Sequence, residues 1–167
     1  MAFLGGPKII IGKRFCLSGR MSFSGPGTLV IGDDVIVNGH CTPFTHAESA
    51  VLRIGDRTFL NGTRFGCAHS IEVGADCILA DVRIMDTDFH AVHKRRNEFG
   101  MGPEVKPVRI GRNVWISAGS AVLKGVEIGD NSVVAFGSVV VKSIPADRIF
   151  GGNPAKDIGV VSEGPQK

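Results

Sequence analysis

The chain has 167 residues, a formal net charge of +3 at neutral pH and 43% hydrophobic residues, which predicts one domain over residues 1–167. The small charge and the lack of a long basic run argue against a nucleic-acid partner. No run of 18 or more apolar residues occurs and the N-terminus is charged too early for a signal peptide, so we expect a cytoplasmic protein without membrane insertion. The four cysteines show no CxxC spacing, which predicts buried thiols rather than zinc or disulfides.

A short signature recurs along the chain: two aliphatic residues flank one other residue and a glycine follows. Its six copies begin at Ile9, Leu29, Leu52, Ile71, Val108 and Val126. The intervals between successive copies are 20, 23, 19, 37 and 18 residues. Self-similarity at a nearly fixed period is typical of repeat architectures, in which each unit stacks on its neighbours.

Two of the intervals, 23 and 37 residues, are clearly longer than the other three. The interval of 23 contains about five extra residues, which we place within 42–50, and the interval of 37 predicts a long loop over about residues 86–107. Loops longer than about 12–15 residues are usually functional or disordered. This loop opens with MDTDFHAVHKRRN, which contains two aspartates, two histidines and three consecutive cations. We therefore expect a regular scaffold whose loop carries chemistry.

The last third shows the repeat unit most clearly, before a short C-terminal tail at about 156–167. Aliphatic residues recur every six positions, and a small or branched residue stands four positions after each: Ile110, Ile116, Val122, Ile128, Val134 and Val140, followed by Val114, Ser120, Val126, Ser132, Ser138 and Ile144. A period of six fits neither a helix nor simple strand alternation. It fits short strands joined by turns at Gly, Asn and Asp. Three such sides form an 18-residue coil, and stacked coils form parallel sheets around an aliphatic core.

Residues 54–158 resemble the sugar O-acetyltransferases of the hexapeptide-repeat class, such as galactoside and maltose acetyltransferases, and their xenobiotic-acetylating relatives. The motifs are DFHAVH, VRIGRNVWISAGSAVL and VVAFGSVVVKSIPADRIFGGNPAKDI, in that order. The resemblance implies an all-β fold, a left-handed parallel β-helix with one long protruding loop. It also implies a homotrimer that transfers an acetyl group from acetyl-CoA to a hydroxyl of a sugar or polysaccharide unit.

The resemblance assigns the general base to His90, on the loop. A sugar hydroxyl attacks a thioester poorly until its proton is removed, and an imidazole, whose ordinary pKa is about 6.5, can remove it at neutral pH. Without the family context, His90 would be read as a residue that caps the loop. Asp86 or Asp88 is a candidate to orient the imidazole, although surface solvation explains either one equally well.

The resemblance assigns acceptor binding to Asn61, Asp88 and His93. Asn61 matches a sugar-binding asparagine of the family, and His93 matches a histidine expected in substrate contact or loop packing. An acidic sugar ligand of the family corresponds here to Ala68, and the repeats begin by Ile9, where galactoside enzymes have a helical segment. The acceptor pocket must therefore differ. The cations at 94–96 either meet an anionic acceptor or form a solvated loop tip.

The resemblance assigns binding of the acetyl-CoA donor to Trp115, Ala118, Phe136 and Lys142. Trp115, the only tryptophan, either walls the acetyl-CoA groove or packs beneath the loop. The Ala118 amide matches the donor to the thioester carbonyl, where an N–H stabilises the developing oxyanion. Phe136 replaces a small residue beside the pantetheine arm, or else packs between coils. Lys142 matches a lysine near the CoA phosphates, and Lys156 is the candidate to replace an arginine that is absent at Gly159.

Three other functions stay open at this point. A xenobiotic acetyltransferase differs only in its acceptor. A hexapeptide carbonic anhydrase requires three histidines that converge on zinc, and the histidines at 40, 46, 69, 90 and 93 do not show that arrangement. A non-catalytic β-helix scaffold would bind no CoA. Transfer by a base and an amide requires no metal, so we expect none.

Overall fold

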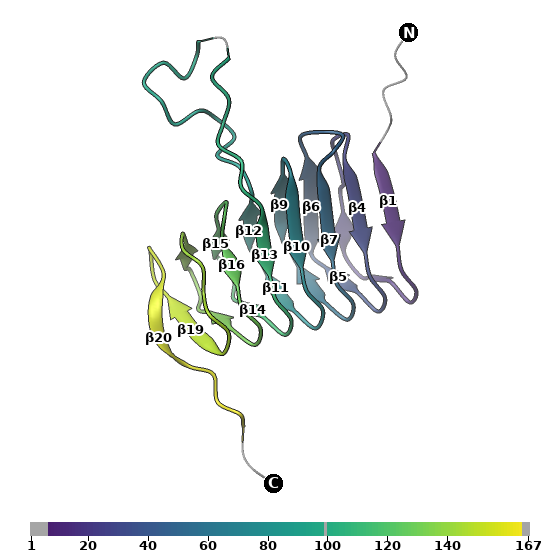
Figure 1. Cartoon of the computed structure of the whole chain (residues 1–167). Coiled ribbons are helices and arrows are strands. Elements are labelled where there is room, and N and C mark those ends of the chain that lie inside the picture. Colours follow the sequence, from purple (N-terminus) through teal and green to yellow (C-terminus); the bar gives the residue numbers. More distant parts are fainter. Residues whose placement is uncertain (1–6, 99, 165–167) are drawn as a thin grey trace.

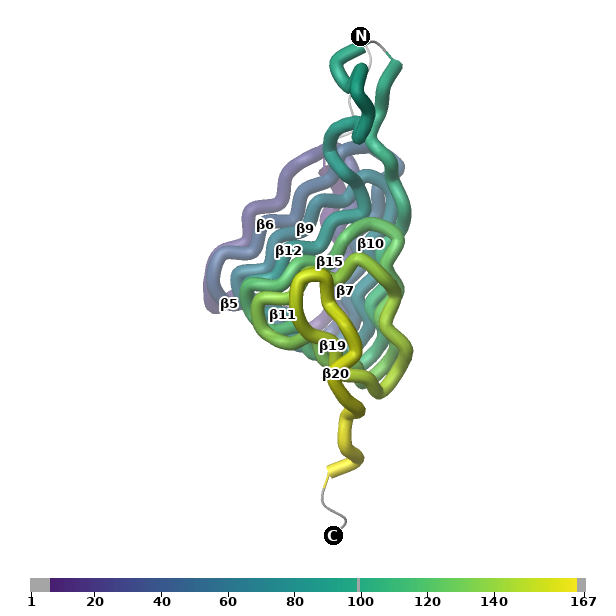
Figure 2. The backbone as a smooth tube through the Cα atoms, turned by 90° about the vertical axis from the view of Figure 1, so that its left-hand side faces the viewer, coloured from purple at the N-terminus to yellow at the C-terminus, as the bar shows by residue number. Residues whose placement is uncertain are grey.

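The inward-facing aliphatic positions dictate the architecture, because each coil buries them only by stacking on the next. The computed structural model describes residues 7–98 and 100–164 as short strands without a helix, wound into a stack of about seven turns (Figure 1). Viewed along the stack, each turn has three sides (Figure 2). The parallel β-helix is confirmed. No helix that could span a membrane occurs in the described part of the chain.

Each side of the coil contributes a strand to one sheet, and we call the outward surfaces of the three sheets the first, second and third faces. The first sheet contains β1 (Lys8–Ile11), β4 (Thr28–Ile31), β7 (Val51–Ile54), β10 (Ser70–Val73), β13 (Val108–Ile110) and β16 (Glu127–Ile128). The third contains β3 (Arg20–Met21), β6 (His40–Thr45), β9 (Arg64–Cys67), β12 (Arg83–Met85), β15 (Ala121–Val122) and β18 (Val139–Val140).

The second sheet continues beyond the regular coils. Its members are β2 (Cys16–Leu17), β5 (Ile36–Asn38), β8 (Phe59–Asn61), β11 (Ile78–Ala80), β14 (Trp115–Ile116), β17 (Val133–Val134), β19 (Arg148–Gly151) and β20 (Lys156–Val160). β20 pairs antiparallel with β19, whereas the coils pair in parallel. The start of the expected tail is thus a strand, and it covers one edge that would otherwise invite further strand pairing.

The core is the aliphatic column that the hexad pattern predicts. All twelve residues of the two hexad series in the last third are at most 3% exposed. Truncation of such an isoleucine to alanine costs about 2–5 kcal/mol. The expectation of buried thiols is confirmed for Cys41, Cys67 and Cys77 but wrong for Cys16, which is exposed because it lies on the outward side of β2.

The corners are formed by the turn residues that the sequence indicates. Asn113 and Asn131 have φ values of 53° and 61°, in the left-handed region that Asn tolerates better than most residues. We call the corner between the second and third sheets the second corner, and the corner between the third and first sheets the third corner. The two insertions that lengthen the repeat both leave the coils at the third corner. They are residues 46–50, between β6 and β7, and residues 86–107, between β12 and β13.

Candidate active site

The long loop is fixed at its root by its own two limbs. Thr87 and Val105 form an antiparallel bridge. The amide of Asp88 donates to the Glu104 carbonyl at 3.2 Å, and the amide of Lys106 donates to the Asp86 carbonyl at 2.9 Å. Beyond this short ladder the loop rises clear of its own coils (Figure 1). The scaffold therefore fixes the beginning of the DFHAVH motif but not the loop tip.

Lys124, in the turn after β15, holds both limbs together. Its Nζ lies 2.9 Å from Asp88 Oδ1 and 3.2 Å from Glu104 Oε2. The hydrogen bond to Asp88 raises the pKa of Lys124, and hydrogen bonds from Lys106 and Lys124 lower the pKa of Glu104. Lys124 could not be identified from the sequence, because its turn joins two regular hexads and carries no motif.

Asp86 has a structural task. Its buried carboxylate accepts hydrogen bonds from the backbone amides of Ala68, His69 and Ser70 at 2.7, 2.7 and 2.8 Å. Burial, followed by the charge of Asp86, raises the pKa of Cys67 to about 12. The Asp86 carboxylate thus bonds to amides of the preceding coil, and the Asp88 carboxylate forms an ion pair with Lys124. Neither carboxylate matches the suggested role of orienting His90.

Phe89, directly before His90, anchors the motif. Its φ of 61° lies in the left-handed region, where a bulky residue is an outlier that the surrounding structure must hold in place. The ring lies directly over Gly66, where a Cβ would collide with it. His46 packs edge-on against the ring, with 5.0 Å between the centroids. This wedge fixes the backbone from which His90 extends, and the sequence analysis did not identify it.

The motif beyond Phe89 faces solvent. The side chains of His90 and His93 are exposed, Val92 is 83% exposed, and only Ala91 is buried. His93 Nδ1 accepts a hydrogen bond from the Arg95 amide at 3.1 Å, so the imidazole is tied to the loop through this nitrogen. His90 is thus presented outward to solvent at the third corner.

A groove of about 560 Å³ follows the second corner, and it brings together three of the four predicted donor residues. It is lined by Ala80, Trp115, Ser117, Ala118, Val133, Ala135 and Phe136. Trp115 is 49% exposed and Phe136 is 78% exposed. Trp115 therefore forms one wall of this groove. It does not pack beneath the long loop, because the loop leaves the coils at the other edge of the third sheet. Phe136 points outward and does not pack between coils.

The remaining predicted residues are divided between the two corners. Asn61 ends β8 at the second corner and pairs in register with Ala80 of the groove. Lys142 follows β18 at the third corner, and Lys156 begins β20, opposite Gly151. Among the described residues of one chain, the third sheet separates His90 from the groove and Asn61.

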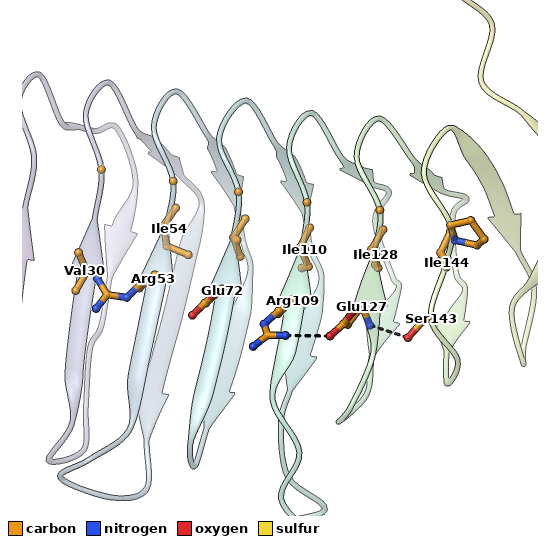
Figure 3. A pocket seen from close by; sticks show the side chains of 17 residues that line it. Val30, Arg53, Ile54, Glu72, Arg109, Ile110, Glu127, Ile128, Ser143 and Ile144 are labelled. Atoms are coloured by element: carbon orange, nitrogen blue, oxygen red, sulfur yellow. Dashed lines mark hydrogen bonds and ion pairs between the residues drawn. The ribbon is translucent and has the colours of Figure 1, made fainter.

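A further hollow of about 790 Å³ covers the first face and contains none of the predicted site residues. Figure 3 shows its wall, a row of alternating charges in register along Arg53, Glu72, Arg109 and Glu127. Arg109 and Glu127 form an ion pair at 3.1 Å. Because Arg109 and Glu127 neutralise each other and none of the predicted site residues lines this hollow, we do not assign the active site there. Within residues 7–98 and 100–164, no group of three or more His, Cys, Asp or Glu residues is arranged to hold a metal ion.

Comparison with known proteins matches residues 107–142 to the bacterial transferase hexapeptide (six repeats) family model. The polysialic acid O-acetyltransferase OatWY is 30% identical, with a TM-score of 0.80, over 96% of this chain and 78% of that chain. A hexapeptide-repeat acetyltransferase from Vibrio cholerae O1 biovar eltor, complexed with acetyl-CoA, is 27% identical over 78% of this chain and 73% of that one, with a TM-score of 0.65.

A third solved structure extends the similarity to a neutral-sugar enzyme. The maltose O-acetyltransferase from Clostridium difficile is 25% identical, with a TM-score of 0.56, over 92% of this chain and 70% of that chain. The repeat, the protruding histidine loop and these similarities agree with one another. The chain belongs to the hexapeptide-repeat acetyltransferase family.

Proposed function

We propose that the protein transfers an acetyl group from acetyl-CoA directly to a hydroxyl of a sugar or polysaccharide unit. One observation carries the proposal: Trp115, Ala118 and Phe136 line a single groove, in a chain that is 30% identical to a polysialic acid O-acetyltransferase. An acetyltransferase structure at 27% identity holds acetyl-CoA, which supports this donor. A cytoplasmic location is part of the same proposal.

In the proposed reaction, His90 accepts the hydroxyl proton while the hydroxyl oxygen attacks the thioester carbon. The carbonyl oxygen becomes an oxyanion, which the Ala118 amide stabilises. The carbon–sulfur bond then breaks, and the proton on His90 passes to the departing CoA thiolate. Lys142 and Lys156 contribute charge toward the CoA phosphates, and Asn61 and His93 contact the acceptor.

We further propose that the site is shared between subunits of a homotrimer. His90 and the groove lie at opposite edges of the third sheet in one chain, so a neighbour's groove must face the loop. The second face supplies a surface for assembly. Cys16, Ile36, Phe59, Ile78, Trp115, Val133 and Ile149 follow one another in register along it. We call this row the apolar ladder; such exposed apolar surfaces mark interaction sites.

The test combines donor binding with acetyl transfer. Calorimetry with acetyl-CoA, followed by mass spectrometry of sialic acid and maltose oligomers, should show donor binding and an O-acetylated saccharide. Both should survive treatment with a chelator. Acetylation of small non-sugar hydroxyl compounds alone would favour a xenobiotic enzyme. Loss of activity on chelation with recovery on adding zinc would favour a carbonic anhydrase relative, and absence of donor binding would favour a scaffold.

A further inference from the structure

The third face carries cations without acidic partners. Arg64 of β9 and Arg83 of β12 are aligned in register on adjacent strands, with Thr42 and Ala121 as the next residues in the row. Both arginine side chains are exposed. None of the six strands of this sheet contains Asp or Glu. Two like charges directly opposite one another on neighbouring strands destabilise a sheet.

Several cations elsewhere on the described surface pair with carboxylates. Arg57 pairs with Asp76 at 2.6 Å, Arg109 with Glu127 at 3.1 Å and Lys124 with Asp88 at 2.9 Å. For Arg64 and Arg83, no carboxylate lies within ion-pair distance among residues 7–98 and 100–164. The unfavourable pair therefore indicates an anion from outside this chain.

A hollow of about 490 Å³ lies beside the two arginines. Besides Arg64 and Arg83, its walls include Phe44, His46, Met85 and Phe89. Phe44 and His46 are themselves packed edge-on, with 4.4 Å between the ring centroids. The hollow thus combines apolar and aromatic surface with two guanidinium groups and an imidazole. A sugar acid has the complementary form, since a pyranose ring has apolar faces and its carboxylate accepts paired hydrogen bonds from arginine.

The hollow adjoins the proposed base, because Phe89 forms one wall and His90 is the next residue. We propose that the hollow between Arg64, Arg83 and His46 binds the carboxylate of an acidic saccharide acceptor, so that a hydroxyl of this or an adjacent sugar reaches His90. This assignment rests on the proposed acetyltransferase function and names its substrate class. The donor's phosphates are a different source of negative charge, and the experiment below separates the two sources by measuring acetyl-CoA affinity in the arginine variants.

The experiment compares a sialic acid oligomer with the same oligomer after its carboxyl groups have been reduced to alcohols. The full-length protein is titrated with each oligomer by calorimetry without donor, and acetyl transfer is then measured with acetyl-CoA. The variants are Arg64→Gln and Arg83→Gln, alone and combined. Arg53→Gln is the matched control, because Arg53 is an exposed arginine of the first face on the same coil as Arg64.

We expect the wild-type protein to bind the acidic oligomer at least about tenfold more tightly than the reduced one, with an affinity that falls as salt rises. The double variant should lose this preference through a raised acceptor KM, while acetyl-CoA affinity stays unchanged. Its melting temperature should be unchanged or slightly higher, because the like-charge contact is removed. Arg53→Gln should behave as wild type.

Equal binding of both oligomers, or an unchanged preference in the double variant, would overturn the acidic subsite even if acetyl transfer is intact. Weakened acetyl-CoA binding in the double variant would reassign the arginines to the donor. If acetyl-CoA does not bind to the wild-type protein, the proposed function fails, whereas the oligomer titration still tests the subsite. The two failures are therefore distinguishable.

Discussion

The second and third faces are built on the same repeat but carry opposite surfaces. The first six strands of the second sheet contain no charged residue, and Ile36, Ile78 and Trp115 are 43–49% exposed along the apolar ladder. The strands of the third sheet contain Arg20, Arg64 and Arg83 and no acid. Both sheets bury equivalent aliphatic residues inward. The repeat thus determines only the inward positions, and the outward positions are available for assembly on one face and ligand binding on another.

The largest effect should come from placing a charge on the apolar ladder. Ile78→Glu should convert the proposed trimer into monomers and abolish transfer, because a buried, unpaired carboxylate is strongly unfavourable at an interface. Ile78 is 47% exposed in the single chain, so folding should be little affected. Light scattering and the melting temperature report assembly and folding separately.

Arg83→Glu is the matched change on the third face. The variant should remain a trimer, with the mass of the wild-type assembly by light scattering, while losing affinity for an acidic acceptor. If Ile78→Glu remains trimeric, or Arg83→Glu dissociates, the assignment of the two faces is reversed or wrong.

Loss of the base should have the next largest effect. His90→Ala should lower kcat by about 10²–10⁴-fold and leave acetyl-CoA affinity unchanged, because the imidazole acts on the acceptor. His93→Ala is the control, since His93 bonds within the loop, and it should act mainly on the acceptor KM. Steady-state kinetics with both substrates distinguishes the two variants, and full activity in His90→Ala would refute the role of this histidine.

A smaller effect is expected where the loop root is clamped. Lys124→Met removes the ion pairs with Asp88 and Glu104, so kcat should fall about three- to tenfold as the base loses its position. Limited proteolysis within residues 86–107 should become faster. The pKa of Glu104 is lowered. The ionised Glu104 carboxylate therefore stabilises the loop root fully above the ordinary Glu pKa, and this stabilisation is lost only as the pH falls through the lowered pKa. Lys8→Met, on β1, is the control variant and should leave both kcat and the rate of proteolysis unchanged.

The smallest effect concerns Phe136. Because this side chain is 78% exposed, Phe136→Ala should change the KM for acetyl-CoA a few-fold, or widen acceptance of longer acyl groups, as expected for lost contact with one wall of a groove. Its melting temperature should move little. Early melting together with an unchanged donor preference would instead make Phe136 a structural residue.

The fold could be predicted from the sequence because the hexads specify it locally. Positions such as Ile116 and Val122 recur without interruption, and each buried side chain repeats the same environment. The loop bounds followed from the spacing of the glycine signatures. Cys16 was assigned wrongly because spacing alone does not tell an inward from an outward position at the first coil.

The site was harder to predict because it depends on contacts between coils. Asp86 resembled a partner for His90 by proximity in sequence, yet it binds amides of the preceding coil. The Arg64–Arg83 pair became visible only when β9 and β12 were aligned in register. Residues 19 positions apart carry no mutual signal in a single sequence unless the length of that particular coil is known.

The central claim is that each active site combines His90 of one subunit with the donor groove of its neighbour. The direct test is a mixed trimer of two inactive variants, His90→Ala and Ala118→Phe, the latter intended to fill the groove. Each should be inactive alone, and mixing them by joint refolding should restore activity to about a quarter of the sites in a ring of three. Restored transfer, with native mass by light scattering, is the predicted result. Mixed trimers that form but remain inactive would show that base and groove act within one chain and would contradict the account.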